Sequence, residues 1–287
     1  MKLRGVFLPI VTPFKNNNID FYSYKTLIDH YIYKKVNGII ANGTTGESST
    51  LDNLEFEKLL DKSVEYNQNR VKIFYGVGGN NTQEVVKKLK IAGKYKIDGI
   101  LSVCPYYNRP SQEGIFNHFL KISESTDLDI IIYNIPYRTG VNMNNEILFK
   151  LAELKNIIGV KDSCGDTRQT VDLIVNAPDN FSVLTGEDNF YYLNMCYGGD
   201  GGILASAHLY TEKYISIFDY FKNNDYRMAL KLWKELINFI SLLFEEPNPA
   251  PVKYLLRKEK LIKSNEVRLP LTGISRELKN KLDKAII

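Results

Sequence analysis

The sequence Ile-Ile-Gly-Val-Lys at Ile157–Lys161 places a lysine at the end of a compact apolar run. A run of this length between helical segments predicts a buried strand, and the turn residues of Asp162–Gly165 follow it. An ammonium group is rarely buried without a partner. Partial burial disfavours the charged form and lowers the pKa of a lysine, and attack on a carbonyl requires the neutral amine. We therefore interpret Lys161 as a candidate Schiff-base nucleophile; the alternative is a lysine whose ammonium reaches solvent.

Apolar runs of strand length alternate with amphipathic helical stretches on both sides of this segment. Eight strand–helix pairs of about 20 to 35 residues each predict a parallel (β/α)8 TIM barrel. A doubly wound sheet is the alternative, but no turn of this sequence has the dinucleotide fingerprint in its required place. Strands are expected over Val6–Thr12, Gly38–Ala41, Val71–Gly76, Gly99–Val103, Asp129–Tyr133, Ile157–Lys161, Phe181–Leu184 and Gly202–Leu204. Helices are expected over 21–35, 53–67, 82–95, 112–125, 144–154, 167–176, 189–197 and 212–223.

The last part of the chain has helical periodicity and no strand pattern. One long helix is expected through Phe244, followed by a break at Pro247, Pro249 and Pro251 and a last helix near Arg276–Ile287. The expected organisation is a barrel over residues 1–224 with a C-terminal helical extension over 225–287 packed on it.

Composition and charge exclude several classes of function. The chain has 37 Lys and Arg and 33 Asp and Glu, interspersed, for a net charge of +4. This pattern indicates solvated helix faces, so we expect no nucleic-acid partner. No apolar run is long enough to span a bilayer and the first residues lack a secretory signal, so we expect a cytoplasmic protein without a membrane partner. Neither the three cysteines nor the three histidines have metal-ligand spacing.

Polar residues follow the predicted strands at the barrel end where active sites lie. The turn Gly43–Ser48 offers threonine hydroxyls and backbone N–H groups that suit a small carboxylate. Tyr133 ends the strand before the lysine strand, so it is placed to move a proton for an imine at Lys161. Arg138 can clamp a carboxylate with two parallel hydrogen bonds. Each residue has an ordinary packing role when taken singly, but the barrel would bring all of them to one face.

The sequence resembles the pyruvate-dependent Schiff-base aldolases of the dihydrodipicolinate synthase and N-acetylneuraminate lyase superfamily. The motifs that carry the resemblance are Gly43–Glu47, Tyr133–Pro136 and the strand-end Lys161. It covers the whole chain, and the C-terminal motifs Glu246–Lys253 and Arg268–Leu271 are most similar to the synthase branch. The resemblance implies a homotetramer or homodimer and a reaction without metal or organic cofactor.

The resemblance also implies catalytic roles. Lys161 would form the imine with pyruvate, and Tyr133 would shuttle protons. Thr44, Tyr107 and Tyr133 would form a hydroxyl relay in which Tyr107 crosses from a neighbouring subunit. Thr45 would hold the pyruvate carboxylate.

The second substrate requires a separate argument, because the superfamily includes several activities. By resemblance Gly186 and Ile203 would line the site through their backbone. In the synthase branch an arginine at the position of Arg138 grips the carboxylate of aspartate semialdehyde. A buried cation without a carboxylate to meet would be costly. We therefore expect condensation of pyruvate with aspartate semialdehyde, a step of lysine and diaminopimelate biosynthesis.

Two departures from the synthase pattern favour a different reaction. Asp162-Ser163 follows the lysine where synthases commonly have Glu-Ala, and Tyr137 stands where Gly or Ser is usual. The alternative is a lyase that releases pyruvate from a keto-sugar acid, hydroxy-oxoglutarate or N-acetylneuraminate. A barrel that only senses or binds a small molecule is a third hypothesis, but a binding protein needs no nucleophile at Lys161.

Synthases of this kind are often inhibited by lysine, and five positions match that allosteric pocket. Ordinary packing at a subunit interface is the alternative interpretation of these positions. Asn53 and Phe56 fall where lysine-sensitive members often carry histidines, which leaves inhibition open. The five positions are Ser48, Ser49, Asn80, Glu84 and Tyr106.

Overall fold

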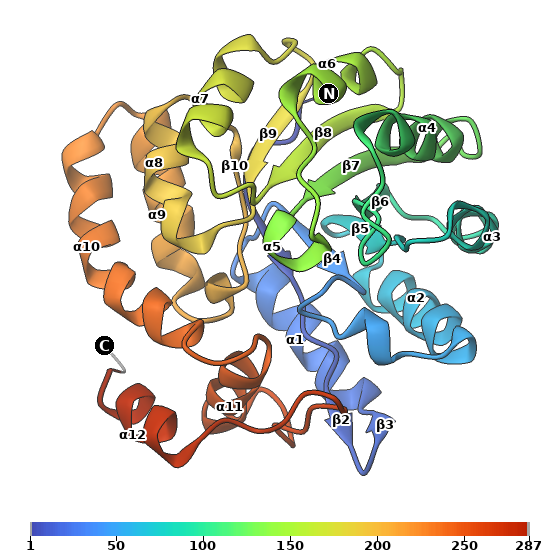
Figure 1. Cartoon of the computed structure of the whole chain (residues 1–287). Helices are drawn as coiled ribbons and strands as arrows, with labels where there is room; N and C mark the ends of the chain where they lie inside the picture. Colours follow the sequence, from blue (N-terminus) through green and yellow to red (C-terminus); the bar gives the residue numbers. More distant parts are fainter. Residues whose placement is uncertain (1, 286–287) are drawn as a thin grey trace. The chain divides into compact units, whose positions relative to one another are not determined.

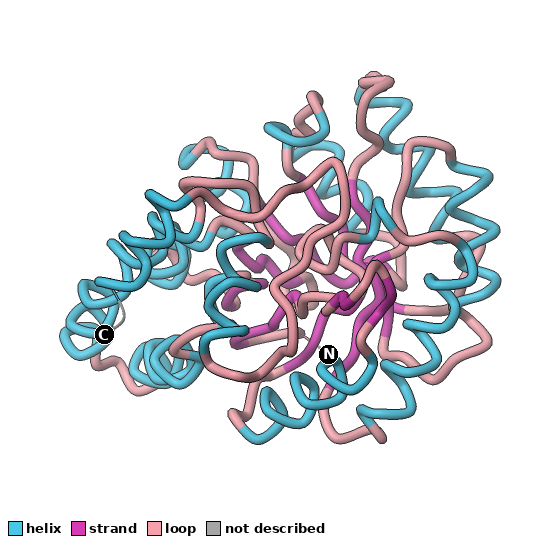
Figure 2. Tube along the Cα trace, turned by 90° about the horizontal axis from the view of Figure 1, so that it is seen from below, coloured by secondary structure: helices cyan, strands magenta, loops and turns pink. Residues whose placement is uncertain are grey.

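The structure, a computed structural model of the chain, describes residues 2–285. Within this range eight parallel strands form one closed barrel in the order β1-β10-β9-β8-β7-β6-β5-β4 (Figure 1). Helices and loops connect the strands (Figure 2). The predicted (β/α)8 fold is therefore confirmed. The barrel strands are β1 (Gly5–Pro9), β4 (Gly38–Ala41), β5 (Lys72–Gly76), β6 (Gly99–Val103), β7 (Asp129–Asn134), β8 (Ile157–Asp162), β9 (Ser182–Thr185) and β10 (Gly201–Ile203).

The helices begin where short polar side chains can cap them. Seven helices of the described range start after an Asp, Asn or Ser whose side chain accepts a hydrogen bond from the first turn. Asp52 and Glu55 form a complete capping box at one of them. The α-helices are α1 (Phe21–Tyr33), α2 (Asn53–Asn67), α3 (Thr82–Ala92), α4 (Gln112–Ser123), α5 (Pro136–Thr139), α6 (Asn145–Ala152), α7 (Thr167–Asn176), α8 (Tyr191–Cys196), α9 (Thr211–Lys222), α10 (Tyr226–Leu243), α11 (Ala250–Lys258) and α12 (Arg276–Ala285), and the 3-10 turns are η1 (Ser48–Thr50), η2 (Asp188–Phe190) and η3 (Ser206–His208).

Two compact units make up the described chain, and the first comprises residues 2–5 and 72–203. It contains β5 to β10 and α3 to α8. Strands β6 to β9 pair in parallel, and the middle of β7, Ile130–Ile132, is fully buried. In this register Tyr133 of β7 and Leu184 of β9 lie beside Lys161 of β8. Tyr133, Lys161 and Leu184 therefore lie at the same height along the strands, near their carboxyl ends.

The second unit comprises residues 6–71 and 204–285. It contains β4, all of β1 but its first residue, α1, α2 and α9 to α12, together with the hairpin of β2 (Phe14–Lys15) and β3 (Asn18–Ile19). That hairpin turns on Asn16 and Asn17, which both have positive φ and so match the twist of the strands. Helices α9 and α10 lie side by side (Figure 1), and Trp233 and Phe239 of α10 are buried. This long helix was expected.

Most predicted elements are confirmed with boundaries shifted by a few residues, but α11 was not predicted. It begins inside the proline-marked break, with Pro251 as its second residue. Proline is tolerated in the first helical turn because its missing N–H has no intrahelical partner there. The last helix runs to Ala285, and the predicted end at Ile287 lies outside the described residues. The division into residues 1–224 and 225–287 stays a prediction.

No helix formed by residues 2–285 combines the length and the apolar character that crossing a membrane requires.

Candidate active site

Lys161 is buried at the carboxyl end of β8, with only 6% of its surface exposed. Its Nζ lies 4.1 Å from the centroid of the Tyr133 ring on the neighbouring strand. Within residues 2–285 no carboxylate forms an ion pair with it. The apolar run before it explains this burial, because Ile157–Val160 pairs on both sides with strands of the barrel core.

Burial lowers the pKa of Lys161 to about 8. The carboxylates of Asp188 and Glu187 oppose this shift, and the charge of Arg138 adds to it. At pH 7 roughly a tenth of such an amine is neutral, against less than one part in a thousand for an ordinary lysine. The site therefore holds a lysine that can act as a nucleophile near neutral pH.

Gly186 follows β9 and leaves room for the lysine side chain. A Cβ at this position would lie 2.5 Å from Lys161 Cε and 2.3 Å from Ser163 Oγ. The Gly186 N–H donates to the carbonyl of Asp162 over 2.7 Å, which holds the loop against the end of β8. A side chain at position 186 would therefore force the side chains of Lys161 and Ser163 to move, while the role of Gly186 in binding stays a prediction.

Tyr133 is buried beside the nucleophile, and burial raises the pKa of its phenol well above the usual value. The phenol therefore stays protonated and can donate its proton near neutral pH. The Ser163 hydroxyl and the charge of Arg138 act in the opposite direction on the pKa of Tyr133. Tyr133 and Ser163 thus lie close to Lys161 within one compact unit, and the charge of Arg138 acts on both Lys161 and Tyr133.

Arg138 lies on the short helix α5, and its Cζ is 5.3 Å from the ring centroid of Tyr137. Both side chains are exposed. The expectation that Arg138 is a buried cation is therefore wrong: α5 lies beyond the end of β7, where the guanidinium stays in contact with solvent. Within residues 2–285 it forms no ion pair and contacts the Tyr137 side chain, so no carboxylate of the described chain occupies its N–H donors.

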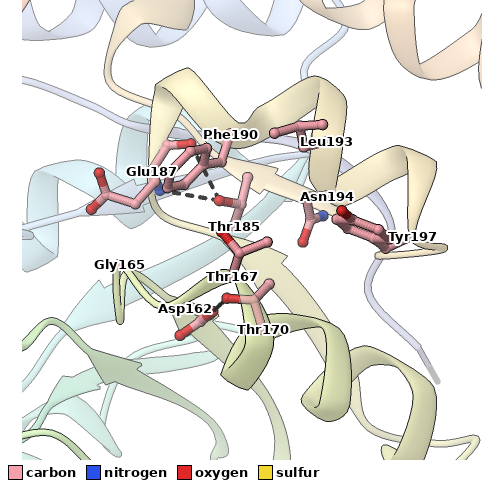
Figure 3. Close-up of a pocket in the computed structure, with 10 residues that line it drawn as sticks. All are labelled: Asp162, Gly165, Thr167, Thr170, Thr185, Glu187, Phe190, Leu193, Asn194 and Tyr197. Atoms are coloured by element: carbon pink, nitrogen blue, oxygen red, sulfur yellow. Dashed lines mark hydrogen bonds between the residues drawn. The ribbon is translucent and has the colours of Figure 1, made fainter.

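The Asp162 side chain forms its hydrogen bonds with residues that follow β8 in the sequence and not with Lys161. Thr170 Oγ1 donates to the Asp162 carboxylate over 2.6 Å (Figure 3), and the Cys164 N–H donates to it over 3.2 Å. Burial raises the pKa of Asp162, and these hydrogen bonds lower it. Asp162 therefore ties α7 to the end of β8, a role that the sequence did not indicate.

The predicted carboxylate turn lies in the second unit. Thr44 is exposed and Thr45 is buried. Asn248 Nδ2 donates to Thr45 Oγ1 over 2.9 Å, so the Thr45 hydroxyl keeps its own hydrogen for another acceptor. Glu47 ends the turn at positive φ, in the left-handed region.

Lys253 of α11 supports this turn and was missed by the sequence analysis. It is 0% exposed, forms an ion pair with Glu47 and donates to the carbonyl of Glu266 over 2.9 Å. The Arg268 N–H donates to the second Glu47 oxygen over 2.9 Å. The motifs Glu246–Lys253 and Arg268–Leu271 carried the signal, but their partner at Glu47 is about 200 residues away in sequence.

Tyr107 is 90% exposed and has positive φ, in the loop after β6. Within residues 2–285 it makes no hydrogen bond to Tyr133. Ile203 is the buried last residue of β10. The relay through Tyr107 stays a prediction.

The residues predicted for a lysine pocket lie at exposed or half-buried positions in both units. Glu84 forms an ion pair with Lys87, and the Asn80 carbonyl accepts from Asn108. Ser48, Ser49 and Tyr106 have no role assigned by the structure, and the pocket stays a prediction.

Two of the three histidines, His118 and His208, are buried. Burial lowers the pKa of His118 and of His208 to about 4, so both are neutral at pH 7. Among the side chains of residues 2–285, no group of three or more His, Cys, Asp or Glu is arranged to hold a metal ion.

Comparison with known proteins places the chain in a family. The model of the dihydrodipicolinate synthetase family matches residues 2–287. The 4-hydroxy-tetrahydrodipicolinate synthase 2 of Clostridium acetobutylicum is 56% identical over 284 residues, covering 99% of both chains.

Two solved structures have the same fold. The dihydrodipicolinate synthase of Acinetobacter baumannii, complexed with pyruvate, has a TM-score of 0.95 and 34% identity, covering 99% of this chain and 98% of that one. The enzyme of Cyanidioschyzon merolae, with lysine bound, has a TM-score of 0.96 and 30% identity, covering 99% and 97%. The chain belongs to the dihydrodipicolinate synthetase family.

Proposed function

We propose that Lys161 forms an imine with pyruvate and that the resulting enamine attacks aspartate semialdehyde. The observation that carries this proposal is an unpaired, buried lysine with a pKa of about 8, beside a buried tyrosine. The chain is a Schiff-base-forming lyase with 4-hydroxy-tetrahydrodipicolinate synthase activity, as family membership and the 56% identical relative support. This activity belongs to lysine and diaminopimelate biosynthesis.

The neutral amine of Lys161 adds to the ketone carbon of pyruvate, and the carbinolamine then loses water. Tyr133 supplies the proton for the departing hydroxyl and accepts one from the methyl group when the enamine forms. Thr44 and Tyr107 connect Tyr133 to solvent, with Tyr107 reaching in from a neighbouring subunit. The high exposure of Tyr107 supports this role, because a side chain that reaches another subunit leaves the surface of its own.

The pyruvate carboxylate binds at the turn of Thr44 and Thr45. The bond from Asn248 leaves the Thr45 hydroxyl hydrogen free for that carboxylate. By the family resemblance, the backbone of Gly186 and Ile203 would line the pyruvate site. Because the amine supplies the electrophilic imine itself, the reaction uses no metal or organic cofactor.

Arg138 binds the carboxylate of aspartate semialdehyde. Its exposed guanidinium has no ion-pair partner in the described chain, and two of its N–H groups can meet one carboxylate. The active species is a homodimer or homotetramer, and we place the enzyme in the cytoplasm. Lysine is the candidate inhibitor at the pocket of Ser48, Ser49, Asn80, Glu84 and Tyr106.

A panel of substrates tests the proposed reaction. Pyruvate consumption with aspartate semialdehyde is compared with pyruvate release from N-acetylneuraminate, hydroxy-oxoglutarate and a keto-sugar acid. The proposal requires aspartate semialdehyde to give the highest kcat/KM by at least about a hundredfold. A higher kcat/KM for any of the aldols would instead assign the chain to the lyases.

A further inference from the structure

Two buried polar atoms next to Lys161 lack a hydrogen-bond partner in good geometry within residues 2–285. They are Ser163 Oγ and Glu187 Oε1. Buried hydroxyl and carboxyl oxygens are nearly always paired, so two unpaired ones at a reactive lysine require an explanation. Ser163 lies beside Gly186, where an added Cβ would be 2.3 Å from Ser163 Oγ and 2.5 Å from Lys161 Cε. The lack of a side chain at Gly186 therefore leaves space for the Ser163 hydroxyl at the nucleophile.

The Ser163 hydroxyl is close to two groups that can hold a proton. It neighbours both the Tyr133 phenol and the Glu187 carboxyl, and it lowers the pKa of each. A serine hydroxyl can accept one hydrogen bond and donate another at the same time. Hydrogen bonds used in catalysis are often long or poorly aligned until the substrate binds. Tyr133, Ser163 and Glu187 therefore form a path for a proton within one compact unit.

Hydrogen bonds to Thr185 anchor the backbone of Glu187. Its N–H donates to Thr185 Oγ1 over 3.1 Å, and that hydroxyl donates back to the Glu187 carbonyl over 3.2 Å. Figure 3 shows the Glu187 side chain extending away from Asn194 and Tyr197, which lie on the opposite side of the pocket. The backbone of Glu187 is thus fixed while its carboxyl is available.

The surroundings of Glu187 favour its protonated form. Burial raises the pKa of its carboxyl and the charge of Asp188 raises it further, whereas Ser163 and Lys161 lower it. Such a carboxyl keeps its proton to a higher pH than an ordinary glutamate and can act as an acid.

We propose that Ser163 and Glu187 form a second proton relay to Tyr133 that lies entirely within one subunit. It complements the route through Thr44 and the partner-derived Tyr107. The proposal rests on the proposed function, because it assigns a proton source to the imine chemistry at Lys161.

The relay provides a donor and an acceptor for each proton that moves during imine and enamine formation. As the carbinolamine C–O bond breaks, Tyr133 gives its proton to the leaving hydroxyl, Ser163 gives one to Tyr133, and Glu187 gives one to Ser163. Water leaves and the protonated imine forms, so one proton has moved from Glu187 to that water. Loss of a methyl proton then converts the imine to the enamine, and this proton returns through Tyr133 and Ser163 to Glu187.

Rapid-quench trapping tests the relay. Protein is mixed with pyruvate, quenched with borohydride at set times, and scored for the adduct on Lys161. We expect Ser163→Ala and Glu187→Gln each to slow imine formation by about tenfold to a hundredfold. The final extent of trapping at saturating pyruvate should equal that of the unchanged chain, which also shows that the site is folded.

A double variant and a matched control make the test specific to proton transfer. Residues of one relay act as a unit, so Ser163→Ala with Glu187→Gln should be no slower than the slower single variant. Asp188→Asn removes a charge that raises the pKa of both Lys161 and Glu187, but it removes no donor or acceptor of the relay. The change that Asp188→Asn makes in the rate of imine formation should multiply with the loss caused by Ser163→Ala. The solvent deuterium isotope effect should rise in both relay variants and stay unchanged in Asp188→Asn.

Several outcomes would overturn the relay. These are an unchanged rate in either single variant, multiplicative losses in the double variant, or an unchanged isotope effect. The absence of any adduct on Lys161 in the unchanged chain would instead refute the proposed function, and the relay with it.

Discussion

Two lysines are buried in residues 2–285, each over an aromatic ring, and they differ in whether a carboxylate meets them. Lys161 Nζ lies 4.1 Å from the Tyr133 ring centroid, and Lys253 Nζ lies 4.2 Å from that of Phe14. Burial lowers the pKa of both to about 8. Lys253 forms an ion pair with Glu47, whereas Lys161 has no such partner in the described chain.

The difference separates a structural lysine from a reactive one. The desolvation cost of Lys253 is offset by the Glu47 carboxylate and a backbone carbonyl, so its ammonium holds α11 to the turn of Thr45. The burial of Lys161 is opposed by the charges of Asp188 and Glu187, but neither carboxylate forms an ion pair with it in the described chain. The low pKa alone therefore does not separate the two lysines; the ion pair of Lys253 with Glu47 does.

Lys161→Met should give the largest effect. We expect kcat to fall by at least about a thousandfold, because no other amine can form the imine. The free energy of unfolding should stay the same or rise by up to about 3 kcal/mol, since a lysine with a pKa of about 8 instead of its usual value destabilises the fold at pH 7. Urea unfolding and steady-state turnover measure the two effects. A strongly destabilised variant would show that Lys161 is structural.

Lys253→Met should give the opposite result in unfolding. Removing one partner of a buried ion pair leaves Glu47 charged and unpaired, which typically costs about 3–5 kcal/mol. The second change Glu47→Gln should restore much of that loss, because the amide oxygen can still accept from the Arg268 N–H. The comparison would fail if Lys253→Met were as stable in urea as Lys161→Met.

Arg138→Ala should give an intermediate effect confined to the second substrate. Loss of a charge-assisted contact costs about 1.5–3 kcal/mol, or roughly tenfold to a hundredfold in kcat/KM for aspartate semialdehyde. Pyruvate trapping on Lys161 should change little, and Arg138→Lys should recover only part of the loss because lysine lacks the fork. Equal losses in both assays would make Arg138 a pyruvate-binding or structural residue.

The smallest effect concerns pH. Imine formation requires neutral Lys161, so its rate should rise about fivefold from pH 7 to 8 and less than about twofold above that. The variant Lys253→Met with Glu47→Gln should keep this profile, although Lys253 also titrates near pH 8. If the rise in rate between pH 7 and 8 disappeared in that variant, the titrating group would be Lys253 and not Lys161.

Much of the fold could be predicted because local patterns decide it. Strand β4 and helices α2 and α7 match their predicted bounds residue for residue. Helix α11 was missed since prolines at 247, 249 and 251 usually end helices, whereas here Pro251 lies in a first turn. The hairpin at Asn16 and Asn17 was missed because its strands are two residues each.

The site was predictable where one strand carries the signal and not where distant segments meet. Lys161 follows from an apolar strand that ends in a cation, and Tyr133 from the preceding strand end. The pairing of Glu47 with Lys253 spans 206 residues, and no local pattern indicates it. The exposure of Arg138 depends on α5, a four-residue helix that periodicity cannot detect.

Borohydride trapping with pyruvate, followed by peptide mass mapping, tests the central claim most directly. The account predicts one reduced pyruvate adduct per chain, on the peptide that contains Lys161, and none in Lys161→Met. Lys253 serves as the internal control, because its burial and pKa match those of Lys161 while Glu47 occupies its ammonium. An adduct on Lys253 or on any other lysine, with Lys161 unmodified, would contradict the account.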